Sequence, residues 1–253
     1  MSRAQLSDII RASLGAVSVG CVVDVGCGES DPFPASAVLE ASGLEAMRFF
    51  GVDPLLSEHA PGFRGTLTEF IDLECLDRPI PDLVLCADAL HCLAAGPAPF
   101  SRYLSSLHPG TPVLLWDFVQ CEASTPESGP ACTLHACKAM IDTELGISHG
   151  EMFTQADLLD TAHRMPVLWS VCAFVPGRRC SVAELTEACE LTLDYAERIA
   201  GNRCLYTRVA RTVRMIALKR DAAYRLEDRL LCIGTVAPES EKQHRQRNER
   251  HDG

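Results

Sequence analysis

The sequence lacks the features that mark membrane and secreted proteins. Its 253 residues contain no run of about 18 or more apolar residues, which a transmembrane helix would need. The N-terminus has no basic start followed by an apolar core and a small-residue cleavage site. We therefore expect neither membrane insertion nor secretion, and we expect a cytoplasmic protein.

An excess of positive charge is also absent. The formal net charge is −11 at pH 7, from 34 acidic and 23 basic residues. Because phosphate backbones attract clustered Lys and Arg, this balance disfavours a broad nucleic-acid surface. Basic residues do gather between Arg203 and Arg220, so local contact with a nucleic acid stays open. The polar segment 238–253 mixes both signs of charge and is predicted to be a disordered tail.

No Cys-x-x-Cys pair occurs, although the chain holds 13 cysteines. Their odd number and the length of the chain argue against the disulfide framework of a small secreted protein. Four lie inside apolar, strand-like stretches: Cys21, Cys86, Cys172 and Cys232. A zinc site can be drawn on paper from Cys121, Cys132, His135 and Cys137. Its spacing fits no ordinary zinc finger, so we expect reduced core cysteines and no metal.

Apolar strand-like stretches alternate with helical patterns in the first half, which predicts an α/β fold. Strands are expected near 20–25, 48–53, 82–87 and 111–117, with a weaker one near 63–70. Helices are expected near 4–14, 35–47 and 98–107.

The second half is less regular. Helices are expected over 132–145 and 154–164, a strand over 167–175, and a helix over 181–200 that opens with the capping-box pattern Ser181-x-x-Glu184. Closing strands are expected over 212–218 and 230–236, although residues 212–218 could equally continue a helix from Cys204.

An apolar stretch at Val22 runs into a turn that contains Gly26 and Gly28. Glycine allows positive φ and a close approach of a ligand to the backbone, as strand-to-helix loops of α/β sheets require. About 25 residues later a second apolar stretch ends in Asp53, whose carboxylate can accept both hydroxyls of a ribose. The two features together predict a nucleoside site.

The charge of the turn indicates which nucleoside. Asp31 stands where a dinucleotide fingerprint has Gly or Ala, and Glu29 adds a second carboxylate. Both would repel a pyrophosphate, whereas a ligand that carries an ammonium and a sulfonium meets no such repulsion. S-adenosylmethionine is such a ligand.

Four motifs in order then resemble the class I S-adenosylmethionine-dependent methyltransferases. Asp24, Gly26 and Gly28 match the acidic residue and G-x-G of the first motif. The resemblance implies that Asp53 binds the ribose, that Asp72 approaches the adenine, and that S-adenosylmethionine is the cofactor. The segment from Asp82 to Leu93 and the strand after Leu107-His108-Pro109-Gly110 are similar to the family's fourth and fifth strands. Further residues expected at the cofactor are Cys27, Leu73 and Ala87.

The resemblance implies a doubly wound, mostly parallel seven-stranded sheet with helices on both faces and a helical cover in the second half. We expect one methyltransferase domain over 1–237 and the tail beyond it. Within the domain we expect an N-terminal helix in 1–19, the cofactor-binding half in 20–120 and the substrate cover in 121–180.

Asp88 and His91 follow the fourth strand, at the expected mouth of the pocket. Either could accept a proton from the acceptor or orient it. The competing interpretation is that Asp88 caps the next helix and His91 packs on its surface. The pattern N-P-P-[YF] of some amino-group methylases is absent after this strand.

The sequence therefore predicts a methyltransferase for a small or medium organic acceptor. An RNA or protein methyltransferase is an alternative in which the segment from Arg203 to Arg220 guides the substrate. A catalytically inactive methyltransferase-like partner subunit is another, and an NAD-linked oxidoreductase is the most distant.

Overall fold

The structure is a computed structural model that describes nine segments of the chain. They are residues 8–9, 12–13, 19–28, 46–73, 78–120, 129–200, 203–218, 224–226 and 228–238. Its strands are β1 Val19–Val25, β2 Ala46–Asp53, β3 Gly62–Arg64, β4 Leu83–Ala87, β5 Pro112–Val119, β6 Val167–Val175, β7 Arg179–Cys180, β8 Tyr224–Arg225 and β9 Asp228–Val236. Its helices are α3 Leu67–Asp72, the 3-10 turn η2 Leu90–Cys92, α4 Ala98–Ser105, α5 Gly129–Glu144, α6 Gln155–Arg164, α7 Val182–Ala200 and α8 Arg203–Leu218.

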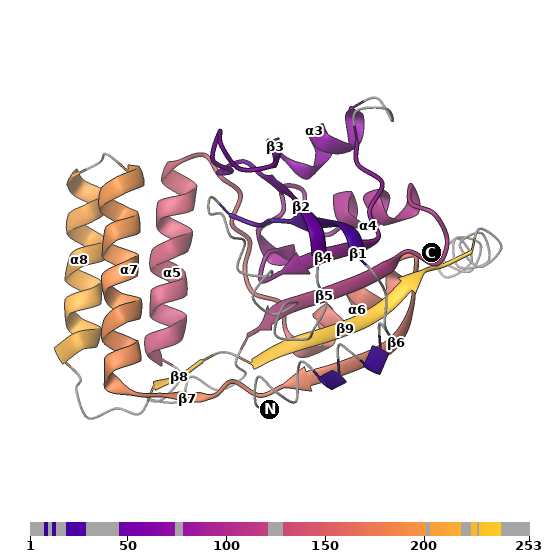
Figure 1. Cartoon of the computed structure of the whole chain (residues 1–253). Helices are drawn as coiled ribbons and strands as arrows, with labels where there is room; N and C mark the ends of the chain where they lie inside the picture. The colour runs from indigo at the N-terminus through magenta and orange to yellow at the C-terminus, as the bar shows by residue number, and fades with distance from the viewer. Residues whose placement is uncertain are drawn as a thin grey trace, which may run out of the picture.

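Seven strands form one twisted sheet in the order β3-β2-β1-β4-β5-β9-β6, which crosses the right-hand part of Figure 1. The five strands from β3 to β5 pair in parallel, and β9 runs antiparallel to both β5 and β6. The predicted mostly parallel, seven-stranded α/β fold is confirmed. Chain order reverses at β1, which lies between β2 and β4, and such switch points are where open α/β sheets bind ligands.

Both faces of the central strands are buried, which explains their continuous apolar sequences. Successive residues of β1 point to opposite faces of the sheet. Val23 lies in one core cluster and Val22 in another. The first cluster includes Phe70 of α3, Phe100 of α4 and Leu158 of α6, so these helices cover one face. On the other face the described N-terminal residues contribute Ile9.

Helices α5, α7 and α8 form a separate layer beside the sheet, side by side at the left of Figure 1. They share a core of their own, in which Ile141 of α5 meets Leu185 of α7 and Val209 of α8. The capping box predicted at Ser181 is present, because its hydroxyl accepts from the amide of Glu184 and the Glu184 carboxylate accepts from Ser181. No described helix is both long and apolar enough to cross a bilayer.

Two secondary-structure predictions were wrong. The strand expected over 63–70 is only three residues long, because Thr66 and Glu69 form a capping box that starts α3. Residues 212–218 are not a strand but the end of α8, as the alternative interpretation of this segment had it. Most of the helix expected over 35–47 lies outside the described residues, and β2 already begins at Ala46. Of the expected N-terminal helix, residues 8–9 and 12–13 are described and helical.

The segment 121–180, expected to form the substrate cover, divides between the two parts of the molecule. Helix α5 belongs to the helical layer, whereas β6 is an edge strand of the sheet and α6 packs against it. Helices α7 and α8, which complete the layer, lie beyond residue 180. Residues 239–253 of the expected tail lie outside the described residues.

The eleven described cysteines are all free thiols. Cys21, Cys86 and Cys232 are buried in the core, as their apolar surroundings predicted. Cys172 is exposed instead, because it lies on the edge strand β6, although its Sγ lies 3.2 Å from that of the buried Cys232.

Candidate functional site

A cavity of about 260 Å³ lies at the carboxyl ends of β1, β2 and β4. The glycines of the β1 turn, the end of β2, the start of α3 and the exit of β4 line one part of it. Helix α5 and the segment after it supply another part, through Lys138, Asp142, Gly146, Ile147 and Ser148. The cavity therefore lies where the sheet meets the helical layer.

The turn after β1 takes the conformation for which glycine is needed. Gly26 and Gly28 have φ values of +77° and +76°, a region that other residues rarely adopt. The amide of Gly26 donates to the carbonyl of Val52 at 2.9 Å, which fixes the turn against β2. A Cβ on Gly26 would collide with the side chain of Ala89, so the turn and the exit of β4 are in close contact.

Asp53 ends β2 and borders the cavity. Its Oδ2 accepts from the amide of Gly28 at 2.9 Å, and its Oδ1 accepts from the amide of Leu55 at 2.7 Å. Each carboxylate oxygen can accept a further bond, so both stay able to bind a ligand. Burial raises the pKa of Asp53, and the two amides oppose that rise.

Asp24 is a buried acid of β1, with 2% of its surface exposed. Burial, reinforced by the charge of Asp53, raises its pKa to about 8. Asp24 is therefore a carboxylic acid near neutral pH.

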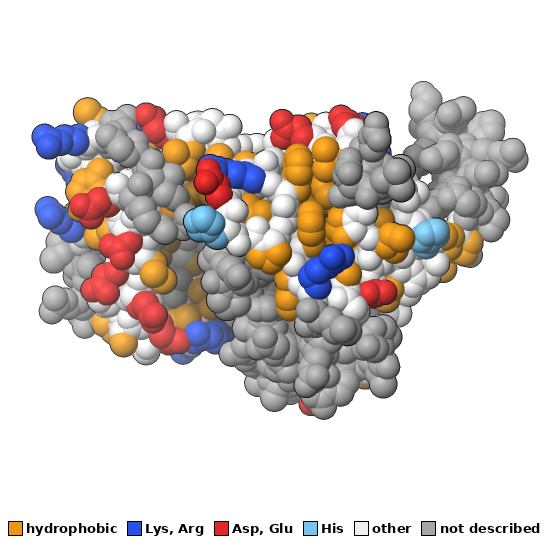
Figure 2. Space-filling view, turned by 45° about the horizontal axis from the view of Figure 1, so that its top comes forward, with side chains coloured by type: hydrophobic (Ala, Val, Ile, Leu, Met, Phe, Trp, Pro, Cys, Tyr) orange, Lys and Arg blue, Asp and Glu red, His pale blue; other side chains and the backbone are white. Residues whose placement is uncertain are grey.

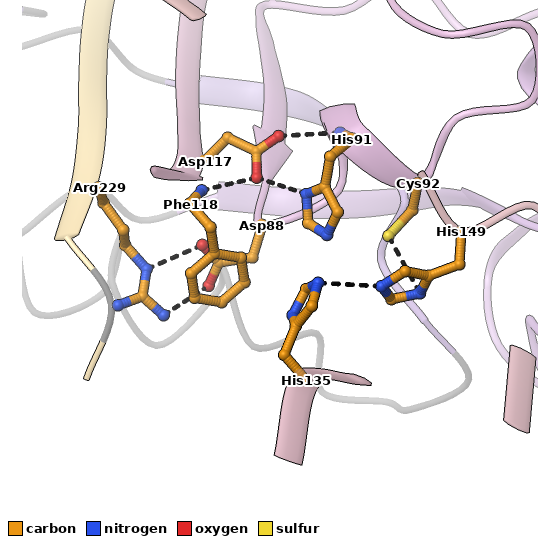
Figure 3. Close-up of polar contacts among 8 residues, drawn as sticks. All are labelled: Asp88, His91, Cys92, Asp117, Phe118, His135, His149 and Arg229. Atoms are coloured by element: carbon orange, nitrogen blue, oxygen red, sulfur yellow. Dashed lines mark hydrogen bonds and ion pairs between the residues drawn. The ribbon is translucent and has the colours of Figure 1, made fainter. Parts of the chain in front are cut away.

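Asp88 lies at the exit of β4 with a φ of +53° and borders the cavity. Its carboxylate is bound by Arg229 of β9, with Nε at 2.8 Å and Nη2 at 3.0 Å. The Arg229 guanidinium also lies 4.2 Å from the centre of the Phe118 ring (Figure 3). Burial raises the pKa of Asp88, and Arg229 opposes the rise. Asp88 does not cap η2, whose N-cap is Ala89 and makes no side-chain bond.

His91 is buried in η2 and held by Asp117 of β5. Asp117 Oδ1 lies 2.7 Å from His91 Nδ1, and its Oδ2 accepts from the His91 amide at 3.0 Å. Burial lowers the pKa of His91, but hydrogen bonds to Asp117 and Cys92 outweigh burial and raise the pKa to about 10. The second ring nitrogen is left to face two further histidines (Figure 3).

Those two histidines are His135 of α5 and His149 of the segment after it. Their Nε2 atoms lie 3.1 Å apart, and His149 Nδ1 lies 2.7 Å from Asp142 Oδ2. Tyr195 of α7 donates to the other oxygen of Asp142 at 2.5 Å. Burial and the neighbouring imidazoles lower the pKa of His135 to about 3. Hydrogen bonds to Asp142 and Cys92 outweigh burial at His149 and raise its pKa to about 9.

Of the residues predicted at the site, Gly26, Gly28, Asp53 and Asp88 border the cavity. The others do not line it: Asp24, Cys27, Asp72, Leu73, Ala87 and His91. Asp72 differs most from its predicted place at the cofactor, because its side chain is 66% exposed and pairs with Arg102 of α4. Thr66 and Leu67 border the cavity after β3 instead.

The sequence interpretation missed the contribution of α5. Lys138 and Asp142 are spaced one helical turn apart, so both face the cavity, but no motif marks them. Only the docking of α5 beside the sheet reveals their role. His135 was considered with cysteines for a paper zinc site, but Cys137 is fully buried in the core of the helical layer. Cys121 lies outside the described residues.

No protein-family model matches the chain, and no curated protein matches it in sequence. Solved structures do match its fold. A candidate methyltransferase from Bacillus halodurans C-125 is 13% identical, with a TM-score of 0.51 over 93% of this chain and 100% of that one. The YcgJ protein from Bacillus subtilis is 11% identical, with a TM-score of 0.53 over 92% and 99%. The chain has the class I methyltransferase fold.

A third structure with this methyltransferase fold is the cyclopropane synthase MmaA2 from Mycobacterium tuberculosis. It is 12% identical, with a TM-score of 0.51 over 90% of this chain and 82% of that one. Since enzymes with different names share the methyltransferase fold, the fold alone does not decide the reaction.

Proposed function

We propose that the protein binds S-adenosylmethionine and transfers its methyl group to a small organic acceptor. The observation that carries the proposal is the meeting of Asp53 with Gly26 and Gly28 at one cavity, with the Asp53 carboxylate held by two amides. A carboxylate so oriented at the end of the second strand suits the two hydroxyls of a ribose. The methyltransferase fold supports the same proposal.

The charge of the cavity suits a cationic ligand. Asp53, Asp88 and Asp142 border it, and Lys138 is the one basic residue among its described lining residues. A sulfonium and an ammonium are attracted by such a lining, whereas a pyrophosphate is repelled. The sequence argument from Glu29 and Asp31 concerns residues outside the described ones, but the described lining leads to the same ligand.

Methyl transfer from a sulfonium is an in-line displacement, so alignment of the acceptor matters most. In the proposed reaction Asp88 contacts the acceptor, because it borders the cavity. Its pairing with Arg229 favours orientation of the acceptor over proton abstraction. His91 lies next to Cys92 of the cavity wall.

A small acceptor is favoured over a nucleic acid. The cavity volume of about 260 Å³ is near the lower end of the range for small-molecule sites. The arginines of α8 lie on a helix that contributes no described residue to the cavity. In the described part of the face in Figure 2, Lys and Arg stand among Asp and Glu and form no continuous basic patch.

Calorimetric titration of the full chain with S-adenosylmethionine, and separately with S-adenosylhomocysteine, tests the proposal. We expect saturable binding of both ligands and an adenosyl ligand in the purified protein by mass spectrometry. Absence of binding to either ligand would favour the inactive partner subunit. Donor-dependent methylation of RNA or protein that weakens steeply as salt rises would favour the polyanionic substrate.

A further inference from the structure

Three histidines from separate parts of the chain converge beside the proposed donor cavity (Figure 3). His91 lies in η2, His135 on α5, and His149 in the segment after α5. One ring nitrogen from each lies within 4.8 Å of the others. We propose that these three nitrogens bind a divalent transition-metal ion, with Zn²⁺ as the first candidate.

Carboxylates prepare two of the imidazoles for this role. Asp117 accepts at Nδ1 of His91 and Asp142 at Nδ1 of His149, both at 2.7 Å. A carboxylate at one ring nitrogen places the proton there and leaves a lone pair on the other, which is the usual support of a metal-bound histidine. Asp117 is itself fixed by the amides of His91 and Phe118, and Asp142 by Tyr195.

The convergence offers a metal ion three nitrogen ligands at one point. The Nε2 atoms of His135 and His149 lie 3.1 Å apart, and the free nitrogen of His91 faces the same point. Protons held on these rings would be released when a metal binds, because the ligating imidazoles are neutral. One metal ion satisfies all three.

The distances suit zinc. With Zn–N bonds of about 2.0–2.1 Å, tetrahedral geometry separates neighbouring ligand atoms by about 3.3 Å. The observed 3.1 Å between His135 and His149 is close to this value, and with all the nitrogens within 4.8 Å of one another, metal binding would draw the set together by up to about 1.5 Å. Neutral imidazole is also a ligand that zinc prefers.

The surrounding fold holds the cluster together. The amide of Gly150 donates to the carbonyl of His91 at 2.9 Å, and a Cβ on Gly150 would collide with that carbonyl oxygen. The segment that carries His149 is thereby fixed against η2. The Phe118 ring meets the rings of His91 and His135 edge-on, each at 5.7 Å, and covers the cluster with apolar surface.

A metal held by three protein ligands keeps a position open for another ligand. His149 adjoins Ser148 and contacts Cys92 and Asp142, and all three of these border the cavity. This step rests on the proposed function: an open position would receive a hydroxyl or thiol of the acceptor. A metal held by the three histidines would supply stabilisation of the deprotonated oxygen or sulfur, with the proton released to solvent. In the transfer, that atom would bond to the methyl carbon as the sulfonium–carbon bond breaks, with release of S-adenosylhomocysteine.

The test is a zinc titration of the full chain after removal of metal with a chelator, against a chromophoric competitor. We expect one Zn²⁺ bound per chain. His135→Ala should weaken binding by more than about 100-fold, because loss of a supporting carboxylate alone costs about 10–100-fold. His108→Ala is the matched control, since His108 lies in an exposed turn outside the cluster, and it should bind as the wild type does.

Equal zinc affinity in the wild type and His135→Ala, or no zinc binding by the wild type, would overturn the proposal. X-ray absorption of the zinc-loaded wild type gives an answer that needs no variant: three imidazole ligands support the site, and fewer than three overturn it. Neither measurement uses the methyl donor. Failure of the metal site and failure of donor binding in calorimetry are therefore separate results.

Discussion

Asp53 is the residue on which the proposed donor site depends most directly. Its carboxylate is already aligned by the amides of Gly28 and Leu55, so ribose hydroxyls would meet a fixed acceptor. Asp53→Ala should weaken binding of S-adenosylmethionine by about 1.5–3 kcal/mol, the usual contribution of hydrogen bonds to a charged group. Calorimetric titration measures this change.

Asp72 provides the matched control for that substitution. The sequence motif assigns it to the adenine, but its exposed side chain pairs with Arg102 and does not border the cavity. Asp72→Ala should therefore leave donor affinity within about 0.5 kcal/mol of the wild type, as for most surface substitutions. Equal losses in the two variants would place the adenosine elsewhere than the cavity described above.

The raised pKa of Asp24 predicts that the stability of the protein depends on pH. Its pKa is about 8 in the folded protein and near 3.8 when unfolded, because burial and Asp53 disfavour its charge. Between these values the folded state holds a proton that the unfolded state has lost, so the free energy of unfolding falls as pH rises. Asp24→Asn removes this contribution. Between pH 5 and pH 8 the free energy of unfolding of the variant should therefore rise by on the order of 2–4 kcal/mol relative to that of the wild type.

Urea unfolding at the two pH values measures the effect of Asp24→Asn. Asp72→Asn is again the control, since its exposed side chain should leave the wild-type pH dependence unchanged. A pH dependence in Asp24→Asn equal to that of the wild type would mean that Asp24 ionises normally in the folded protein.

Local sequence motifs could predict the site residues whose positions are set by the neighbouring sequence. Gly26 and Gly28 follow one strand and Asp53 ends another, and the apolar sequences of both strands make them predictable. All three residues border the cavity. His135 and His149 carry no such signal, because their meeting with His91 depends on how α5 docks beside the sheet. Asp72 was assigned from a strand that proved to be a helix, so its side chain points to the surface.

At the scale of elements, the turn between β1 and the next segment must fit against the exit of β4. Gly26 and Gly28 share the same positive φ, but a Cβ would meet Ala89 only at Gly26 and open space at Gly28. Gly28→Ala should cost about 1–2 kcal/mol of stability from the backbone alone. Gly26→Ala should cost about 1–3 kcal/mol more, because it adds overpacking.

Thermal or urea unfolding of the two glycine variants compares the same chemical change at two sites. If both lost equal stability, the close contact of the turn with Ala89 would be refuted. Gly26→Val should be worse again and should abolish donor binding, because a branched side chain disfavours this φ further.

Elements also show where sequence patterns decide between helix and strand. A strand was expected over 63–70, yet the chain turns into α3 at Thr66. The local signal was the Thr66-x-x-Glu69 capping box, in which both side chains bond to backbone amides. The same pattern at Ser181 was used in the sequence interpretation and was confirmed there.

At the scale of the whole molecule, the cavity joins two parts with separate cores. The sheet contributes Gly26, Asp53 and Asp88, and the helical layer contributes Lys138 and Asp142 through α5 alone. Helix α7 supplies no described lining residue, and it reaches the site through the bond from Tyr195 to Asp142. The alternation of apolar strand-like stretches with helical patterns could predict the sheet, but it could not place a layer whose docking depends on contacts distant in sequence.

This arrangement predicts how a bound ligand protects the chain from hydrogen exchange. S-adenosylhomocysteine should slow exchange in the segments that line the cavity, which are 26–28, 52–55, 66–67, 88–94 and 138–148. Helix α8 contributes no described lining residue, so its exchange should stay unchanged. Asp53→Ala under the same conditions should lose protection in all five segments together, because they enclose one ligand. Protection confined to the first four would detach α5 from the donor site. Protection that spread over α8 would mean that the ligand stabilises the fold globally instead of filling this cavity.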